Sequence, residues 1–404
     1  MTSRLRLLVV SPHPVQHEGP AMRALAARDD IKLTVAYCSL PDPRLYRGAE
    51  YLTRGAFDDV PERGFSSIAL RNRSPRPSLG RFWGLWNPEV GALLASREFD
   101  VCLVYGYAYA TSWHAFAAAR RSGVALIMST DATSWSPVSE VSAIKLALKK
   151  RLLPWIYRRA DVIAVPGSAG QRFIRSLGIS SDCVAITPYV VDNDTIAATA
   201  ARADIAAVRT GWSVPSGARV VLYVGKFLSR KRAIDVLRAL AVMRTPDVCA
   251  VLVGTGPEES LLRLEAAALG VENRVRFVGL VAYDRLPEAY AAADVVVVPS
   301  SNEPWGLPVN EAMVCGRPVV ASDRVGSAAD LVRDGVTGVV YPCGDTTRLA
   351  AALDGIIGDP QRAATMGRAA RTRMDDWSPT ANADAVAAAA HRAVAIRADA
   401  GRTR

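Results

Sequence analysis

Short runs of aliphatic and β-branched residues recur along the whole chain, with helix-like segments between them. Few of these runs alternate between polar and apolar positions, which is typical of parallel strands buried on both faces. The first half predicts strands at Leu5–Val10, Lys32–Cys38, Val101–Tyr105, Val124–Ser129, Val162–Val165 and Val184–Ile186. The second half predicts strands at Val220–Val224, Ala250–Gly254, Val275–Val278, Val295–Val298, Pro318–Ala321 and Gly338–Tyr341.

Amphipathic or alanine-rich segments separate the predicted strands, for example Arg232–Met243 and Glu258–Leu269. Strands that alternate with helices indicate βαβ units, and so an α/β fold with two Rossmann-like, doubly wound parallel sheets. The chain of 404 residues has room for two such domains. We expect the first to span residues 1–191 and the second residues 192–375, with a C-terminal helical segment, about 376–404, returning to the first.

Composition narrows the class of protein. Hydrophobic residues make up 50% and charged residues 22%, which excludes a disordered chain. The net charge is +10, but the Lys and Arg residues are dispersed, so they do not form a nucleic-acid-binding arm. None of the 6 Cys residues forms a C-x2-C pair, which argues against a zinc knuckle or a disulfide scaffold.

Membrane and targeting signals are weak. The first apolar stretch ends at Ser11-Pro12, too early for a signal peptide, and is better explained as a strand. The chain lacks an apolar run of the ~18 residues that a membrane span needs, so we expect a cytoplasmic protein. Residues 145–159 carry six Lys and Arg residues among Leu, Ile and Trp, and form either a solvated helix face or a peripheral contact with anionic lipid.

The most informative segment runs from Ser300 to Met313 and follows a predicted strand. Gly306 and Leu307 precede a helix that Pro308 favours, so free backbone N–H groups there can bind a phosphate. Glu303 precedes this anion site and Glu311 lies within the helix, where carboxylates can accept hydrogen bonds from sugar hydroxyls. The alternative is a solvated loop followed by a Glu that favours the helix dipole.

A second segment places Lys226 and Lys231 in a strand-to-helix loop. Two ammonium groups can neutralise a diphosphate and stabilise it as a leaving group, provided that this loop faces the first one. Otherwise the segment is a basic, solvated turn. The later Gly254-Thr255-Gly256 lacks the third glycine of a dinucleotide fingerprint and is interpreted as an ordinary helix start.

Candidates in the first half are less specific. Gly19 follows the first strand and precedes a helix, where it can approach a phosphate, and Asp131 lies just after another strand, where an Asx turn is equally possible. His13 and His17 have the spacing of a helical metal pair, but the prolines around them disfavour a helix, so we do not expect a zinc site there. Asp192 and Asp194 form a D-x-D that we interpret as a helix cap and not a metal site.

Three segments together resemble glycosyltransferase family 4. Gly225-Lys226-Phe227 through Lys231 is similar to the family's G-R-L-x-x-x-K-G. Arg276 to Asp294 is similar to its F-x-G…L…Y-x-x-A-D run, and Glu303 to Glu311 matches its E-x7-E motif with the aromatic-Gly-Leu core. The resemblance covers most of residues 218–350, whereas the first half matches mainly in the order of its strands.

The resemblance implies the GT-B architecture, in which two Rossmann-like domains face a cleft and the second binds a nucleotide-sugar donor. It implies that Lys226 and Lys231 bind the diphosphate and that Glu303 contacts the sugar. It further implies that Gly306 and Leu307 bind the diphosphate through backbone N–H groups, and that Glu311 contacts the ribose. Members of the family transfer sugars with retention and without a metal.

This sequence departs from the family pattern at several positions. Lys226 replaces the usual Arg, which leaves a point charge in place of a bidentate contact. Arg232 and Ser327 each stand where Gly is usual. Asp131 is the nearest ionisable residue to a position where many members have His, so we expect it to be the catalytic candidate of the first half, beside Glu303 of the second.

The sequence therefore predicts a retaining, metal-independent hexosyltransferase that uses a nucleoside-diphosphate sugar. A UDP-sugar is expected on family frequency alone, and the acceptor, which can be a small molecule, a glycan or a lipid-linked molecule, is expected to bind the first half. Two alternatives stay open: a nucleotide-sugar epimerase of GT-B fold, and a non-catalytic nucleotide-sugar-binding or scaffold subunit. The sugar, the acceptor and the oligomeric state are not determined by the sequence.

Overall fold

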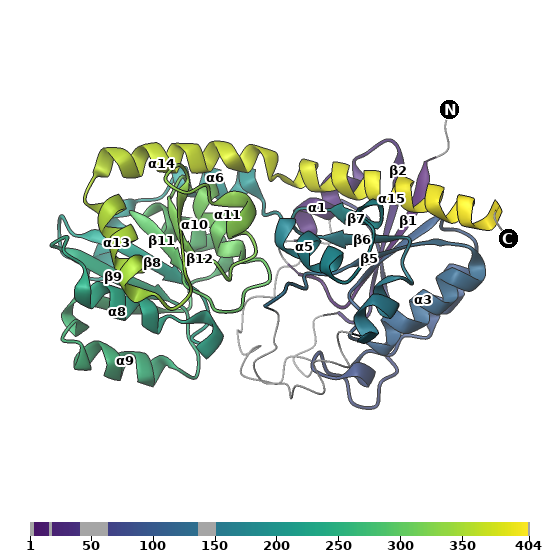
Figure 1. Ribbon diagram of the computed structural model, residues 1–404, viewed down its shortest axis with the longest axis horizontal. Coiled ribbons are helices and arrows are strands. Elements are labelled where there is room, and N and C mark those ends of the chain that lie inside the picture. Colours follow the sequence, from purple (N-terminus) through teal and green to yellow (C-terminus); the bar gives the residue numbers. More distant parts are fainter. Residues whose placement is uncertain (1–3, 16–17, 41–63, 136–150, 403–404) are drawn as a thin grey trace. The chain divides into compact units, whose positions relative to one another are not determined.

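The computed structural model describes residues 4–15, 18–40, 64–135 and 151–402. The chain forms two compact units (Figure 1). Unit 1 consists of Met1–Val190 together with Pro379–Arg404, and unit 2 consists of Val191–Ser378. The chain therefore leaves unit 1 once, completes unit 2, and returns to unit 1 through its C-terminal helix.

Unit 1 contains a parallel sheet with the strand order β3-β2-β1-β4-β5-β6-β7. Its strands are β1 (Leu5–Ser11), β2 (Ile31–Tyr37), β3 (Ser66–Ala69), β4 (Val101–Tyr105), β5 (Ala125–Ser129), β6 (Val162–Val165) and β7 (Val184–Ile186). Its helices are α1 (Glu18–Ala26), α2 (Glu89–Ala95), α3 (Ala110–Ser122), α5 (Ser168–Ser176) and α15 (Pro379–Arg402), with short 3-10 turns η1 (Phe82–Gly84) and η2 (Ser181–Cys183). Residues 151–157 are also helical.

The two faces of the unit 1 sheet are covered by different helices. One face packs against α2, α3, the 151–157 helix and α5 through residues such as Leu94, Phe116 and Ile174. The opposite face packs against α1 and α15, where Leu25 and a row of buried alanines from Ala383 to Ala393 meet the strands (Figure 1). Small alanine side chains let the long α15 lie close to the sheet.

Unit 2 contains a second parallel sheet, with the order β10-β9-β8-β11-β12-β13. Its strands are β8 (Arg219–Val224), β9 (Val248–Val253), β10 (Val275–Gly279), β11 (Val295–Val298), β12 (Val319–Ser322) and β13 (Gly338–Tyr341). Its helices are α6 (Asn193–Ala201), α7 (Ile205–Gly211), α8 (Ile234–Val242), α9 (Glu259–Ala268), α10 (Leu286–Ala291), α11 (Leu307–Val314), α12 (Ala328–Leu331), α13 (Thr346–Ile357) and α14 (Pro360–Arg373). Short 3-10 turns are η3 (Ser229–Lys231), η4 (Glu272–Arg274), η5 (Tyr283–Arg285) and η6 (Met374–Asp376).

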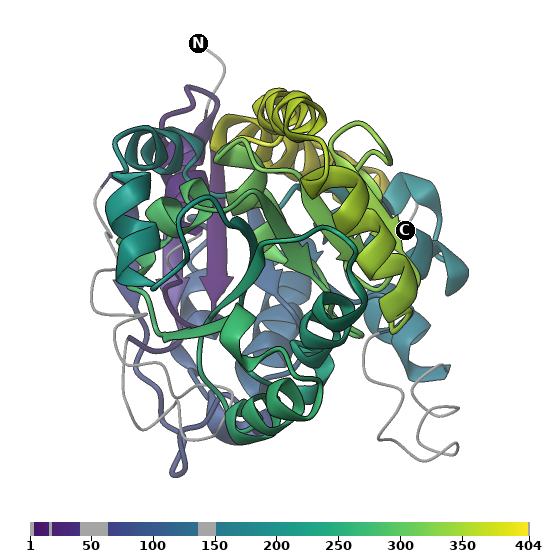
Figure 2. The same ribbon diagram turned by 90° about the vertical axis from the view of Figure 1, so that its left-hand side faces the viewer.

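Local signals explain several helix boundaries in unit 2. The side chains of Asp192, Asp204, Asp345 and Asp359 each accept a hydrogen bond from a backbone N–H of the helix that follows. Such caps satisfy donors that have no partner within the helix. Helices α8, α9 and α13 pack on one face of the sheet (Figure 2), and α6, α10 and α11 pack against one another.

The predicted fold class is confirmed: both units are α/β with parallel sheets, and every strand predicted from the sequence is present within two residues at each end. Strand β3 was not predicted. Its sequence, Ser-Ser-Ile-Ala, lacks a β-branched run, and it is a strand because it pairs with the edge of β2. None of the described helices combines the length and apolar character that crossing a bilayer requires.

Candidate functional site

The order of strands in unit 2 reverses between β8 and β11, which are neighbours in the sheet. The loops that follow these two strands diverge, and open α/β sheets bind ligands at the carboxyl ends of such strands. The first loop holds residues 225–231 and the second holds residues 299–306. They are joined directly, because the backbone oxygen of Arg230 accepts hydrogen bonds from the N–H of Ser301 at 2.8 Å and from its hydroxyl at 3.2 Å.

Lys231 and Glu303 form an ion pair between these loops, in which the Lys231 ammonium donates to Oε2 of Glu303. The side chains are only 19% and 11% exposed, so water screens the pair weakly. Two backbone hydrogen bonds to a separate loop segment fix the position of Glu303. Its N–H donates to the oxygen of Arg324 at 3.2 Å, and its oxygen accepts from the N–H of Gly326 at 2.9 Å.

Lys226 lies at the start of the first loop and is partly buried. Its backbone oxygen accepts a hydrogen bond from the Tyr223 hydroxyl at 3.0 Å. This loop packs directly on Gly254, where a Cβ atom would lie 2.0 Å from the oxygen of Gly225. Gly256 likewise has no room for a side chain, with the oxygen of Phe227 at 2.5 Å. The Gly254-Thr255-Gly256 segment therefore lets two backbone loops pack closely.

Helix α11 begins at Leu307, directly after Gly306, which has a φ of +97° that side chains disfavour. Pro308 occupies the first turn, where its missing N–H costs nothing. The loop before the helix is held rigidly: the Trp305 indole donates to Oδ1 of Asn310 at 2.9 Å and stacks on Trp377. The positive end of the helix dipole is thus fixed at the carboxyl edge of the sheet, beside Glu303.

Ser327 stands where the family usually has Gly, and its side chain forms a contact that Gly could not. Its φ is −67°, so no glycine is needed there, and its hydroxyl donates to the oxygen of Gly306 at 3.4 Å. Gly326, in contrast, is required, since a Cβ atom would lie 1.9 Å from the oxygen of Pro304. The departure from the family pattern at Ser327 therefore leaves the loop intact.

Glu311 lies on α11 and is buried, with Oε2 accepting a hydrogen bond from the Tyr290 hydroxyl at 2.6 Å. Burial raises the pKa of Glu311, and the hydrogen bond from Tyr290 opposes that rise. Burial and the nearby Glu311 carboxylate together raise the pKa of Tyr290 well above its ordinary value. Nothing in the sequence pairs these residues, because 21 positions separate them and the packing of α10 on α11 brings them together.

The candidates from the first half belong to unit 1 and are described within it alone. Gly19 is buried in the first turn of α1, just after β1. Asp131 is exposed, two residues beyond the end of β5. Strand β4 lies between β1 and β5, so these two candidates do not follow adjacent strands. His17 lies outside the described residues.

Glu18 is a buried acid that the sequence analysis did not single out, although it adjoins Gly19. Its Oε2 accepts a hydrogen bond from the Ser11 hydroxyl at 3.4 Å. It lines a small cavity of about 30 Å³ with Tyr105 and Tyr189. Burial raises the pKa of Glu18 to about 8, and the hydrogen bond from Ser11 opposes that rise. The raised pKa means that this carboxyl group loses its proton at a higher pH than an ordinary Glu does.

Metal ligands do not cluster in the part of the chain that the structure describes: no three His, Cys, Asp or Glu side chains converge there. Asp192 instead caps α6, with Oδ1 accepting from the N–H of Thr195 at 3.1 Å. Whether the reaction needs a metal is a separate question, and metal independence stays a prediction.

Known proteins share both the sequence of unit 2 and the fold of the chain. Residues 204–373 match the family model described as glycosyl transferases group 1. A D-inositol 3-phosphate glycosyltransferase of Salinispora tropica is 38% identical over 189 residues, which are 44% of this chain and 39% of that protein. A GDP-mannose-dependent alpha-(1-6)-phosphatidylinositol monomannoside mannosyltransferase of Mycolicibacterium smegmatis is 36% identical over 168 residues, 39% of this chain and 44% of that protein. The matched part thus spans less than half the length of these relatives.

Solved structures share the fold over nearly the whole chain. HepE of Anabaena, in complex with UDP, superposes with a TM-score of 0.69 at 23% identity, covering 95% of this chain and 98% of that one. Sucrose-phosphate synthase of Thermosynechococcus elongatus gives a TM-score of 0.70 at 22% identity, covering 94% and 96%. The two parallel-sheet domains are those of the GT-B architecture. Residues 204–373, less than half of the chain, are thus similar to the group 1 glycosyl transferases.

Proposed function

We propose that this protein is a retaining, metal-independent glycosyltransferase that transfers a hexose from a nucleoside-diphosphate sugar to an acceptor. The observation that carries the proposal is the Lys231–Glu303 ion pair, which joins the two loops at the switch point of the unit 2 sheet, beside the start of α11. A cation, a helix N-terminus and a carboxylate at one sheet edge suit a diphosphate bound to a sugar.

Each residue has a defined task in this proposal. Lys226, Lys231 and the N-terminus of α11 neutralise the diphosphate, Glu303 accepts a hydrogen bond from a sugar hydroxyl, and Glu311 accepts one from the ribose. During transfer the bond from the anomeric carbon to the diphosphate oxygen breaks, and the acceptor oxygen bonds to that carbon on the same face. The acceptor proton passes to the departing diphosphate. Lys226 and Lys231 lower the barrier because negative charge grows on the leaving oxygen beside them.

The ion pair also implies that donor binding rearranges the site. Lys231 and Glu303 neutralise each other, and their side chains are only slightly exposed. A diphosphate competes for Lys231 while a sugar hydroxyl offers Glu303 a new partner. Removing only one member of the pair would leave the other charge poorly solvated. Such a variant should therefore be less stable than one that lacks both members.

We further propose that the donor is a UDP-sugar. HepE of Anabaena was solved with UDP and, in a related structure, with UDP-glucose, which supports uridine. The mannosyltransferase of Mycolicibacterium smegmatis is named for GDP-mannose, so guanosine donors belong in the test. The acceptor is proposed to bind unit 1, on the side of the sheet edge that holds Asp131.

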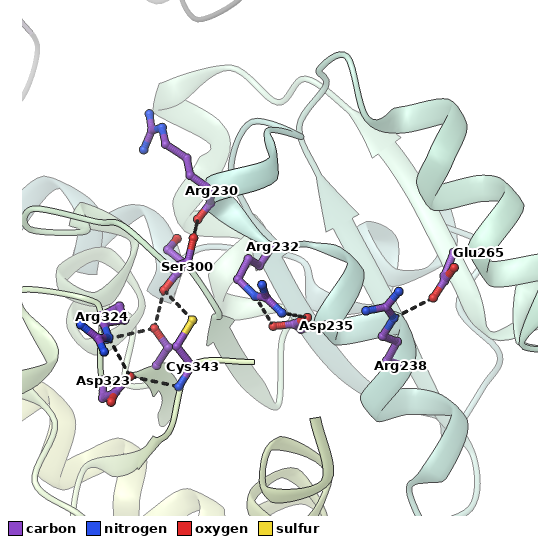
Figure 3. Close-up of polar contacts among 11 residues, drawn as sticks. Arg230, Arg232, Asp235, Arg238, Glu265, Ser300, Asp323, Arg324 and Cys343 are labelled. Atoms are coloured by element: carbon purple, nitrogen blue, oxygen red, sulfur yellow. Dashed lines mark hydrogen bonds and ion pairs between the residues drawn. The ribbon is translucent and has the colours of Figure 1, made fainter. Parts of the chain in front are cut away.

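The test measures nucleotide release by the whole chain, in buffer treated with EDTA, from a panel of UDP-, GDP- and ADP-sugars. We expect slow release from one donor and a loss of at least about 100-fold in both Glu303→Ala and Lys231→Ala. Glu265→Ala is the matched control, because it removes a Glu of the same unit that also pairs with a cation, Arg238, away from the site (Figure 3). It should release nucleotide like the wild type.

Other outcomes favour the alternatives. Conversion of the sugar while it stays attached to the nucleotide would indicate an epimerase. Binding of a donor without turnover on any acceptor of a broad panel would favour a non-catalytic subunit. Failure to bind any nucleotide sugar, or release that EDTA abolishes and Mg²⁺ restores, would contradict the proposal.

A further inference from the structure

One outer surface of unit 1 is formed by helical segments that are rich in Arg and contain no Asp or Glu. Helix α3, the segment 151–159, which is helical over 151–157, and α5 cover the same face of the sheet, and none of the three contains Asp or Glu. They carry seven arginines: Arg120, Arg121, Arg151, Arg158, Arg159, Arg172 and Arg175. None of the seven forms an ion pair with another described residue, whereas Arg4, Arg263, Arg285 and Arg371 elsewhere each pair with a carboxylate.

Apolar side chains are exposed on the same surface. Leu152 is 45% exposed and Trp155 is 51% exposed, and they lie three positions apart on one side of the helix. The Arg159 guanidinium lies 3.2 Å from the centre of the Trp155 ring and 5.8 Å from that of Trp113. The two indoles are themselves 5.9 Å apart. Exposed Leu and Trp flanked by Arg are the pattern of a helix that lies in a membrane interface.

The surface is also hollowed. A groove of about 750 Å³ is lined by residues of α3 and of the 151–159 segment, among them Arg120, Arg158, Arg159, Trp113 and Trp155. The crowding of cations has an electrostatic effect: burial and the nearby Arg120 lower the pKa of Arg159. An arriving anion would relieve this repulsion, so the surface is complementary to negative charge.

We propose that this surface, made of α3, the 151–159 segment and α5, docks on an anionic phospholipid bilayer. Trp155 and Leu152 enter the interface between headgroups and acyl chains, and the arginines contact lipid phosphates. A nucleic acid would also satisfy the arginines, but it offers no apolar layer for Leu152 and Trp155. The inference goes beyond the proposed transfer reaction and does not depend on it, because no residue of the unit 2 site takes part.

The test is co-sedimentation of the whole chain with vesicles, which needs no sugar donor. We expect binding to vesicles that contain phosphatidylglycerol, little binding to pure phosphatidylcholine, and a steep fall in binding with salt. Arg120→Glu/Arg158→Glu should weaken binding at least about tenfold, since each basic residue near an anionic surface contributes about a fivefold change. Trp155→Ala should weaken it several-fold and should remove most of the fluorescence quenching by brominated lipids.

Matched controls separate this surface from net charge. Arg348→Glu/Arg368→Glu makes the same change in charge on exposed positions of unit 2, and Leu264→Ala truncates an exposed apolar residue there. Both should bind vesicles like the wild type. Equal weakening by the charge control, undiminished binding by the Arg120/Arg158 variant, or wild-type binding to neutral vesicles would overturn the proposal. So would the absence of vesicle binding, including the case in which duplex DNA binds instead. Unchanged melting curves show that each variant is folded.

Discussion

The carboxylate of Glu311 lies in surroundings that oppose its charge. Burial raises its pKa, and the hydrogen bond from Tyr290 works in the opposite direction. If Glu311 accepts a hydrogen bond from the donor ribose, only the ionised form serves. Donor affinity should then fall as the pH falls through the raised pKa. The free energy of unfolding depends on pH in the opposite sense. A carboxyl whose pKa is raised on folding destabilises the folded state as the pH rises through that pKa.

We predict that Tyr290→Phe shifts the acid limb of donor affinity to higher pH by about one unit. The reason is that the lost hydrogen bond had favoured the charged form of Glu311, and hydrogen bonds to charged groups contribute about 1.5–3 kcal/mol. Calorimetric titration of the nucleotide between acidic and neutral pH measures the shift. Tyr109→Phe is the control, because that hydroxyl donates to the oxygen of Leu79 in unit 1. Identical pH profiles for wild type and Tyr290→Phe would show that Glu311 does not bind the donor through its charge.

At the scale of elements, the join between η3 and α8 shows how this chain replaces a glycine. Arg232 has a φ of +51° and a ψ of +40°, in the left-handed region where an L-residue is disfavoured by ~1–2 kcal/mol. Its guanidinium forms two hydrogen bonds, at 2.7 and 2.9 Å, with Asp235, whose side chain is fully buried (Figure 3). The strained backbone and the ion pair oppose each other in energy.

Arg232→Gly should therefore destabilise the protein, although it supplies the residue that the backbone favours. Relief of strain contributes about 1–2 kcal/mol, but leaving the Asp235 carboxylate buried without its partner costs about 3–5 kcal/mol. We expect a net loss of about 2 kcal/mol by urea denaturation, largely recovered in Arg232→Gly/Asp235→Ala.

Arg97→Gly is the matched control for the backbone alone. Arg97 has a φ of +58°, is exposed, and forms no ion pair with another described residue. Its replacement should change the free energy of unfolding by less than about 1 kcal/mol. If Arg232→Gly changed the free energy of unfolding no more unfavourably than Arg97→Gly, the ion pair with Asp235 would not contribute to stability.

At the scale of the whole molecule, the chain ends in the unit in which it began. Helix α15 packs against α1, β5 and β6, so the last residues complete the core of unit 1. Ala390 lies at the centre of this contact and is fully buried. Unit 2 has its own separate core, built from other strands and helices. A defect in α15 should therefore affect one unit more than the other.

We predict that Ala390→Asp destabilises unit 1 by at least about 3 kcal/mol, because it buries a carboxylate without a partner. Hydrogen exchange followed by mass spectrometry should show faster exchange in β1, β4, β5 and α1, while β8 to β13 keep their protection. Ala395→Asp, on the exposed side of the same helix, should leave both units protected. Equal loss of protection in unit 2 would mean that the two units do not unfold independently.

The sequence by itself determined the α/β class, nearly all strands, and the loops that hold Lys231, Glu303 and Glu311. These features depend on local patterns: buried β-branched runs, a glycine and a proline at a helix start, and carboxylates at fixed spacing. Strand β3 was beyond this reasoning, since its residues have little intrinsic preference for a strand and only the edge of β2 recruits them.

The tertiary structure alone decided which distant groups meet. It joined Tyr290 to Glu311 and Lys231 to Glu303, because the reversal of strand order and the packing of α10 on α11 bring separate segments to one place. It also brought together positive charges that lie far apart in the sequence. The arginines are dispersed along the sequence, but seven of them share one surface of unit 1, since three helices cover the same face of its sheet. Spacing along a chain reports neighbours within one element, whereas contacts between elements depend on how the sheet orders its strands.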